Sequence, residues 1–237
     1  MISWEHVALR RSSGRRATPR SAEGTSLVYA TAFYRVCDLD ELRRMVAEVG
    51  AAELITTGPD GYPRATLLPV IWTGDVVRAH MARPNPHWAE IPDNTPALLV
   101  CAGPQAYVSP SWYPSKREHG KVVPTWNYTS VHLRGTATVH DDPEWLRDQI
   151  AALTDLNERD RSHPWQVTDA PSRFIDGQLR GIVGVEINVE RVEGKAKLSQ
   201  NRSSEDQNGV IDGLGRETRS GARDIADAMR VAATPAR

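Results

Sequence analysis

Residues 83–88, Arg-Pro-Asn-Pro-His-Trp, place a cation and hydrogen-bonding groups where a strand is expected to pass into a short helix. Asn85 is a good N-cap, and the proline after it suits the first helical position. The free N–H groups and dipole of a helix start favour a phosphate, and Arg83 and His87 stand on either side of this start. Arg64, early on a preceding strand, could add a bidentate contact. The segment therefore predicts an anion site, with a purely structural role as the alternative.

A second candidate is the run Pro-Thr-Trp-Asn-Tyr at residues 124–128. Because side chains alternate along a strand, Thr125 and Asn127 share one face, and Trp126 and Tyr128 share the other. One face then offers a hydroxyl and an amide, and the other offers two flat rings. The pattern is typical of a polar and aromatic pocket, and equally of a barrel strand with aromatic side chains at a subunit interface.

A third candidate is the run Gly-Lys-Ala-Lys-Leu-Ser-Gln-Asn-Arg at residues 194–202, which follows an apolar strand. Lys197, Gln200 and Arg202 are the donors that a phosphate or carboxylate clamp would use. A solvated run of charges is the alternative reading of the same residues.

No catalytic or metal-binding motif accompanies these candidates. The sequence contains no GxSxG, HExxH or Walker loop. Histidines such as His80, His132 and His140 are isolated, and Cys37 and Cys101 are far apart, so neither a metal site nor a disulfide framework is predicted. No catalytic residue is assigned, and whether the chain is an enzyme stays open.

Composition excludes several classes of protein. The net charge is −1, which argues against a surface built for nucleic acid or for an anionic membrane. There is no run of ~18 apolar residues and no apolar block of a signal peptide, so we expect no membrane partner. Two isolated cysteines are typical of a reduced, cytoplasmic protein.

The candidates require a scaffold of antiparallel strands. Turn signals at residues 58–61 and 74–75 separate apolar segments and predict a β-meander. We expect strands over residues 51–57, 63–73, 76–82, 97–109, 123–140 (with a bend at Gly135) and 182–193. We expect helices over residues 38–49, 142–159 and 172–179, a short helix after Asn85, and a loop over 111–122. The fold class is therefore mainly β (α+β), an antiparallel split β-barrel with peripheral helices.

The chain divides into three parts. Residues 1–27 are basic and turn-rich without periodicity, so we expect a disordered or loosely attached extension whose deletion leaves stability nearly unchanged. Residues 28–214 are expected to form the split-barrel domain. Residues 215–237 are expected to form a charged C-terminal tail that could hold one weak helix around 223–231.

Four blocks of the chain together resemble the PaiB family, and they are residues 80–88, 103–113, 123–128 and 194–202. The resemblance implies a split barrel related to the pyridoxamine-phosphate oxidase type, FMN as cofactor, and a homodimer with cofactor sites at the subunit interface. For some members it also implies negative control of sporulation or protease genes. The expected function is therefore FMN binding, in a negative transcriptional regulator or a small flavin oxidoreductase.

The resemblance and the side-chain chemistry together assign cofactor contacts to both subunits. Arg64, Arg83 and the backbone at Asn85 are expected to hold the flavin phosphate. The partner is expected to supply the clamp and the groups near the ring. The full expected set of cofactor-binding residues is Arg64, Thr66, His80, Met81, Arg83, Asn85, His87, Trp126, Asn127, Lys197, Gln200 and Arg202.

One position departs from the family pattern. Many relatives carry a histidine at the place of Leu67, and similar proteins, the piperazate synthases, bind haem and form an N–N bond. Leu67 cannot serve as an axial ligand, because haem iron needs an N, S or O donor. His80 or His87 would have to replace it. A haem-dependent enzyme is thus one alternative, and a cofactor-free regulatory or interaction protein is another.

A split barrel leaves open strands and apolar surface that a two-fold partner can cover. We therefore expect an obligate homodimer, with the aromatic-rich segments 107–113 and 123–128 at its interface. The family label also suggests DNA binding. Specific binding is expected to be weak or absent, because the chain has no apparent reading helix and a net charge of −1.

Overall fold

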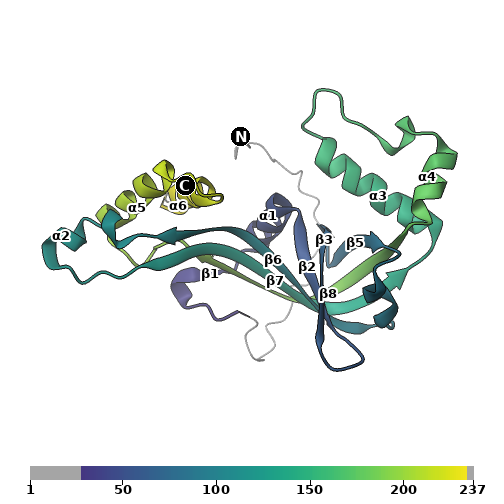
Figure 1. Ribbon diagram of the computed structural model, residues 1–237, viewed down its shortest axis with the longest axis horizontal. Helices are drawn as coiled ribbons and strands as arrows, with labels where there is room; N and C mark the ends of the chain where they lie inside the picture. The colour runs from purple at the N-terminus through teal and green to yellow at the C-terminus, as the bar shows by residue number, and fades with distance from the viewer. Residues whose placement is uncertain (1–27, 234–237) are drawn as a thin grey trace, which may run out of the picture.

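The computed structural model describes residues 28–233, so the expectations for residues 1–27 lie outside the described residues. The described chain forms an antiparallel sheet that curls into a split barrel, with helices around it (Figure 1). The strand order is β3-β2-β6-β7-β8-β5-β4, and β1 pairs with β8. The strands are β1 Arg35–Val36, β2 Ala51–Thr57, β3 Pro63–Pro69, β4 Ile71–Thr73, β5 Val76–Ala82, β6 Thr95–Val108, β7 Thr125–His140 and β8 Ile182–Lys197.

The first strands form the expected meander, with one break. β2 pairs with β3 across the turn at Gly58–Gly61, where Gly61 has a left-handed φ of 82°. The single strand expected over residues 63–73 is divided at Val70, whose N–H bonds to the carbonyl of Gly50. Pro69 has no N–H to give to a ladder, so the chain turns there and β4 pairs with β5 instead.

Three long strands carry the sheet beyond the barrel. β7 has 16 residues and pairs with β6 on one side and with β8 on the other. β8 continues to Lys197, four residues past the expected end at Glu193, because its ladder with β7 continues to the pair Tyr128 and Lys197. The expected bend at Gly135 is present as a shift of the β7–β8 register between Arg134 and Gly135.

The barrel core lies inside the curled strands. β3, at one end of the strand order, contacts β5 near the other end. Helix α1, Leu39–Val49, closes this core with Leu42 and Val46. It begins where Asp38 accepts from the N–H of Glu41 and ends at left-handed Gly50, as its sequence predicts.

Two further helices, α3 Pro143–Glu158 and α4 Ser172–Leu179, cover β5 and β8 from outside the barrel. The indole of Trp145 lies over Gly184, where a Cβ would come within 2.2 Å of the ring. Trp145 also stacks on His140 with 4.3 Å between ring centroids. Glycine at position 184 therefore allows α3 to approach the sheet closely.

The expected loop over residues 111–122 contains helix α2, Ser115–His119. The carboxylate of Asp206 holds its start by accepting from the backbone N–H and the hydroxyl of Ser115. Ser115 and Asp206 are 91 positions apart in the sequence, so no local pattern indicated this helix. The remaining short helices are η1 Ala32–Tyr34, η2 Pro86–Glu90, η3 Pro110–Trp112 and η4 Val167–Asp169.

Helices α5, Ser204–Arg216, and α6, Ala222–Ala233, pack on the end of the sheet far from the barrel (Figure 1). They form a second core with β6 and β8, and its buried members are Ala106, Val108, Tyr113, Leu198, Val210, Ile211, Leu214, Ala222, Ile225, Ala226 and Met229. The chain beyond residue 214 is therefore packed structure up to the end of α6. No helix among the described residues has both the length and the apolar character needed to cross a membrane.

Candidate functional site

Polar residues expected at the strand-to-helix junction form hydrogen bonds with one another. His87 is buried, with its Nε2 2.9 Å from the Thr56 hydroxyl and its Nδ1 2.8 Å from the Thr66 hydroxyl. Asn85 accepts from the backbone N–H of His87 at 3.0 Å and donates to the Thr66 hydroxyl at 3.3 Å. Burial lowers the pKa of His87. Both ring nitrogens are thus engaged within the barrel wall.

The two arginines expected at the phosphate are each paired with carboxylates. Arg64 donates to Glu90 at 2.8 Å and to Asp60 at 3.0 Å. Arg83 pairs with Asp141 and donates to two backbone carbonyls between α4 and β8, at 2.8 and 3.0 Å. An anion arriving at this junction has to compete with these carboxylates for the two guanidinium groups.

His80 and Met81 lie on opposite faces of β5. Met81 is 2% exposed and belongs to the barrel core. The Nδ1 of His80 lies 2.7 Å from Oε1 of Gln149 in α3. His80 therefore faces α3, whereas Thr66 faces His87 inside the barrel wall.

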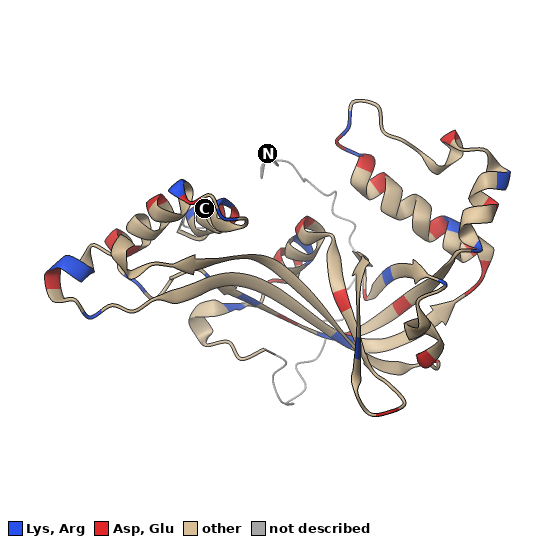
Figure 2. Cartoon of the chain, in the orientation of Figure 1, with Lys and Arg blue, Asp and Glu red and all other residues tan. Residues whose placement is uncertain are grey.

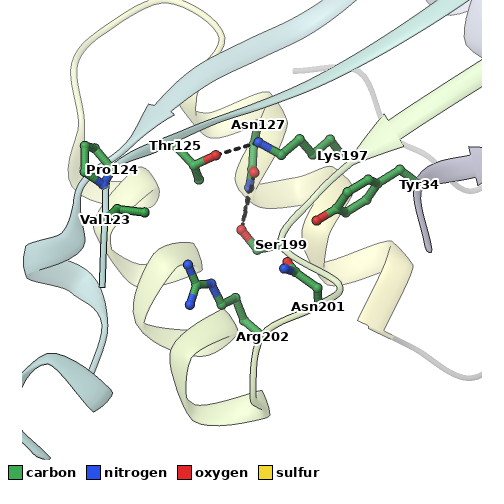
Figure 3. A pocket seen from close by; sticks show the side chains of 9 residues that line it. All are labelled: Tyr34, Val123, Pro124, Thr125, Asn127, Lys197, Ser199, Asn201 and Arg202. Carbon is green, nitrogen blue, oxygen red and sulfur yellow. Dashed lines mark hydrogen bonds between the residues drawn. The ribbon is translucent and has the colours of Figure 1, made fainter. Parts of the chain in front are cut away.

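The other group of expected residues meets where β7 starts and β8 ends. A pocket of about 190 Å³ opens there (Figure 3). The amide of Asn127, fully buried, donates to the Ser199 hydroxyl at 3.0 Å. In Figure 3 the ammonium of Lys197 and the guanidinium of Arg202 lie on opposite sides of Ser199. The pocket is lined by Tyr34, Val123, Pro124, Thr125, Asn127, Lys197, Ser199, Asn201 and Arg202.

The charge of this pocket is positive. Lys197 and Arg202 line it, and none of its lining residues within the described chain is acidic. Burial lowers the pKa of Lys197, Tyr128 opposes this effect, and the nearby charges of Lys195 and Arg202 add to it. Figure 2 shows that β6 and β7 carry little charge along their length. An anionic group is the ligand that this arrangement favours.

Two residues that were expected to contact the cofactor, Gln200 and Trp126, do not line this pocket. Several residues that do line it were not among the expected cofactor contacts. Gln200 caps the end of β8, because its side chain accepts from Leu198 N and donates to Ala196 O. Trp126 is 45% exposed on the opposite face of β7 and lies edge-on to Tyr107. Ser199 and Asn201 lie inside the block 194–202, so that block already marked their position. Tyr34 comes from a segment with no local signal. Thr125 was expected on the Asn127 face, without a role in the cofactor site.

The two groups of residues lie at opposite ends of β7. Lys197 pairs with Tyr128 near the start of the strand, and Arg83 bonds to Asp141, directly after its last residue. β7 has sixteen residues, and the 13 positions from Tyr128 to Asp141 span about 43 Å of extended strand at ~3.3 Å per residue. That distance is far longer than one flavin. One protomer therefore does not bring the two groups to a single flavin.

The arrangement of strands is that of a split β-barrel. A FAD and haem binding protein from Mycobacterium smegmatis is similar in structure, with a TM-score of 0.55, 18% identity, and coverage of 73% of this chain and 78% of that one. A conserved hypothetical protein from Mycobacterium tuberculosis is similar with a TM-score of 0.50, 15% identity, and coverage of 73% and 92%.

The sequence comparisons are more specific than the fold. A family model described as "Putative FMN-binding domain" matches residues 28–191. "Protease synthase and sporulation protein PAI 2" from Bacillus subtilis is 32% identical over 206 residues, which cover 85% of this chain and 96% of that protein. The chain therefore belongs to the PaiB family, whose domain carries that FMN-binding description.

Proposed function

We propose that the protein binds FMN in a site completed by two subunits. The observation that carries the proposal is the match to the FMN-binding family over residues 28–191. The cationic pocket at Lys197 and Arg202 supports it, because FMN needs positive charge around its phosphate. In this proposal one subunit contributes the residues around Arg83 and Thr66, and the partner contributes Lys197, Arg202 and the strand at Asn127.

The sheet has an outer face that a second copy can cover. Figure 1 shows α1, α5 and α6 on one side of the long strands, and β1 extends the same sheet beside β8 among the described residues. Alternation in the ladders places Leu67, Ile55, Leu98 and Val100 on this outer face. Leu67 is 62% exposed, and Trp126 also faces outward on β7. The same ladders place Glu53, His132 and Arg134 on this face. Its exposed apolar side chains favour burial against a partner.

A two-fold partner would also bring together the two groups of site residues that lie at opposite ends of β7 in one subunit. Two copies packed through their outer faces with opposite strand directions would bring the Lys197 end of one close to the Arg83 end of the other. A C2 interface uses the same patch on both subunits, which a continuous sheet face supplies. The homodimer and the shared cofactor site are thus one proposal.

The dimer is tested by placing a charge on the outer face. Leu67→Glu should shift the protein from a dimer to its monomer mass of 26.2 kDa, because the interface would bury an unpaired carboxylate. Val231→Glu is the matched control, since Val231 is 53% exposed on α6, away from that face. Light scattering at micromolar concentration reports the mass. A wild-type protein that runs as a monomer would exclude the dimer.

The flavin assignment is tested by titration. Arg83→Ala should weaken FMN binding by roughly 10- to 150-fold, because a charge-assisted contact is worth ~1.5–3 kcal/mol. Arg78→Ala is the matched control, since Arg78 lies on the same strand and pairs with Glu186 at 2.9 Å. Quenching of flavin fluorescence measures both. Equal affinity for wild type and Arg83→Ala would remove Arg83 from the site, and absence of quenching at ~100 µM FMN would reject FMN itself.

The haem alternative finds less support among the histidines. His87 has both ring nitrogens bonded to threonine hydroxyls, whereas His80 engages Nδ1 with Gln149, a bond that is compatible with ligation through Nε2. Leu67 offers no donor atom to iron. An absorbance spectrum of the purified protein separates the cofactors, since flavin shows two broad near-visible bands and haem a sharp Soret band. Oxidation of NADPH by the FMN-loaded protein would then mark an oxidoreductase, and its absence would favour a regulatory role.

A further inference from the structure

The pocket at the β7–β8 end is too small for a whole flavin and suits one charged group. Its volume is about 190 Å³, below the ~300–1,000 Å³ of pockets that enclose drug-sized ligands. It exceeds the space of several waters, at ~30 Å³ each. A phosphoryl group with its hydration shell matches that size.

The turn that builds the pocket adopts an unusual backbone conformation. Ser199 has a φ of 64°, in the left-handed region that residues other than glycine seldom adopt, and it is 3% exposed. The Arg202 N–H bonds to the Ser199 carbonyl at 3.0 Å, so the chain folds back at once. The turn thereby returns Arg202 to the pocket that Lys197 lines. Such conformations cluster at ligand sites.

The carboxylate of Asp206, the buried acidic residue that follows in the chain, is engaged away from the cations of the pocket. Asp206 is 4% exposed, and its two oxygens accept from the N–H and the hydroxyl of Ser115. Lys197 donates to Thr125 and to the carbonyl of Trp126, two of the three donors of an ammonium. The guanidinium of Arg202 lies over the Tyr113 ring at 4.8 Å. Neutral groups therefore hold both cations in place and leave their charge uncompensated by the described lining residues.

A segment from the start of the described chain closes one side of the pocket. β1 pairs with β8, Val28 N donates to Glu193 at 3.0 Å, and Lys195 donates to the Tyr29 carbonyl at 2.7 Å. These contacts place Tyr34 in the pocket wall. Lys195 bonds to this segment, whereas Lys197 lines the pocket.

We propose that this pocket is a subsite for a dianionic phosphoryl group, bound by Lys197 and Arg202 and walled by Tyr34. Two cations without a lining carboxylate complement two negative charges, and Asn201 adds an amide at the rim. The group belongs either to the flavin or to a separate phosphorylated ligand. Naming the flavin as one molecule that could carry this group rests on the proposed function. The charge and size of the group are inferred from the pocket alone.

The first test uses inorganic phosphate and the full-length protein, by calorimetry at constant ionic strength. Wild type should bind one phosphate per chain, and Lys197→Met and Arg202→Met should each weaken binding at least tenfold, as expected for a lost charge-assisted contact. Arg216→Met is the matched control, because Arg216 is an exposed cation that bonds within α5 to the carbonyl of Asp212 at 3.1 Å. Lys197→Arg should retain binding and shows that the fold tolerates substitution there. Phosphate binding that is absent in wild type, or unchanged in both variants, overturns the proposal.

The second test identifies the molecule that carries the group. If it is the flavin, phosphate competes with FMN but not with riboflavin, and Lys197→Met weakens FMN binding alone. If it is a separate ligand, phosphate binds the FMN-loaded protein and Lys197→Met leaves FMN affinity unchanged. Both results support the subsite. Binding of phosphate without any binding of FMN would reject the flavin function and retain the subsite, so the two proposals fail separately.

Discussion

Gly135→Ala is expected to destabilise the protein by about 3 kcal/mol or more. A Cβ at this position would lie 1.9 Å from the carbonyl oxygen of Asn188 and 2.8 Å from its carbon. Both are backbone atoms of β8 at the register shift, so they cannot rotate away as a side chain would. The long β7–β8 ladder would have to separate locally, and urea unfolding monitored by circular dichroism measures the cost.

Gly177→Ala is the matched control for that substitution. Gly177 lies inside α4, and the nearest atom to an added Cβ is 3.8 Å away, on the flexible side chain of Arg180. Alanine there should be neutral or should stabilise the protein by up to ~1 kcal/mol, because glycine is a poor helix former. A Gly135→Ala protein as stable as wild type would show that β7 and β8 do not meet with this register.

Ile225→Asp is expected to have the second large effect, about 3–5 kcal/mol of lost stability. Ile225 is fully buried on α6, in the second core with Val108 and Leu214. An aspartate there loses the packing of the isoleucine and buries an unpaired carboxylate. α6 would leave the sheet or the end of the sheet would unfold.

Val231→Asp on the same helix isolates the effect of burial from that of helix propensity. Val231 is 53% exposed, so its replacement should change the melting temperature by no more than a few degrees. Thermal unfolding of the two variants measures the difference. Equal melting temperatures would mean that residues 222–233 behave as the loose tail that their charge pattern predicts, and that α6 contributes little to the second core.

Local patterns predicted the elements whose boundaries depend on nearby residues. The cap at Asp38 and the left-handed Gly50 define α1, and the turn at residues 58–61 defines the first hairpin. Alternating apolar residues indicated most strands, and the motif blocks indicated the family. These features depend on backbone geometry within a few residues, which a sequence encodes directly.

Elements that are stabilised by residues distant in the sequence were not predicted correctly. Helix α2 depends on Asp206, 91 positions from Ser115. The sequence of α6 predicts only a weak helix, and its apolar residues are buried against β6 in the folded chain. The end of β8 at Lys197 follows from a ladder with β7, since the alternation of β8 alone had ended earlier. In each case the stabilising contact is non-local, so composition within the segment does not contain it.

The sequence by itself determined the split barrel, the family and the cationic block at residues 194–202. Tertiary structure decided which of the cations have carboxylate partners. Arg64 and Arg83 are expected phosphate ligands in the sequence, and the fold places Glu90, Asp60 and Asp141 beside them, so a ligand has to compete with these carboxylates. Lys197 and Arg202 were expected in a clamp, with a solvated run of charges as the alternative, and a buried turn places both in the lining of one pocket. The difference arises because the strength of a charge depends on its neighbours in space, which only the packed chain specifies.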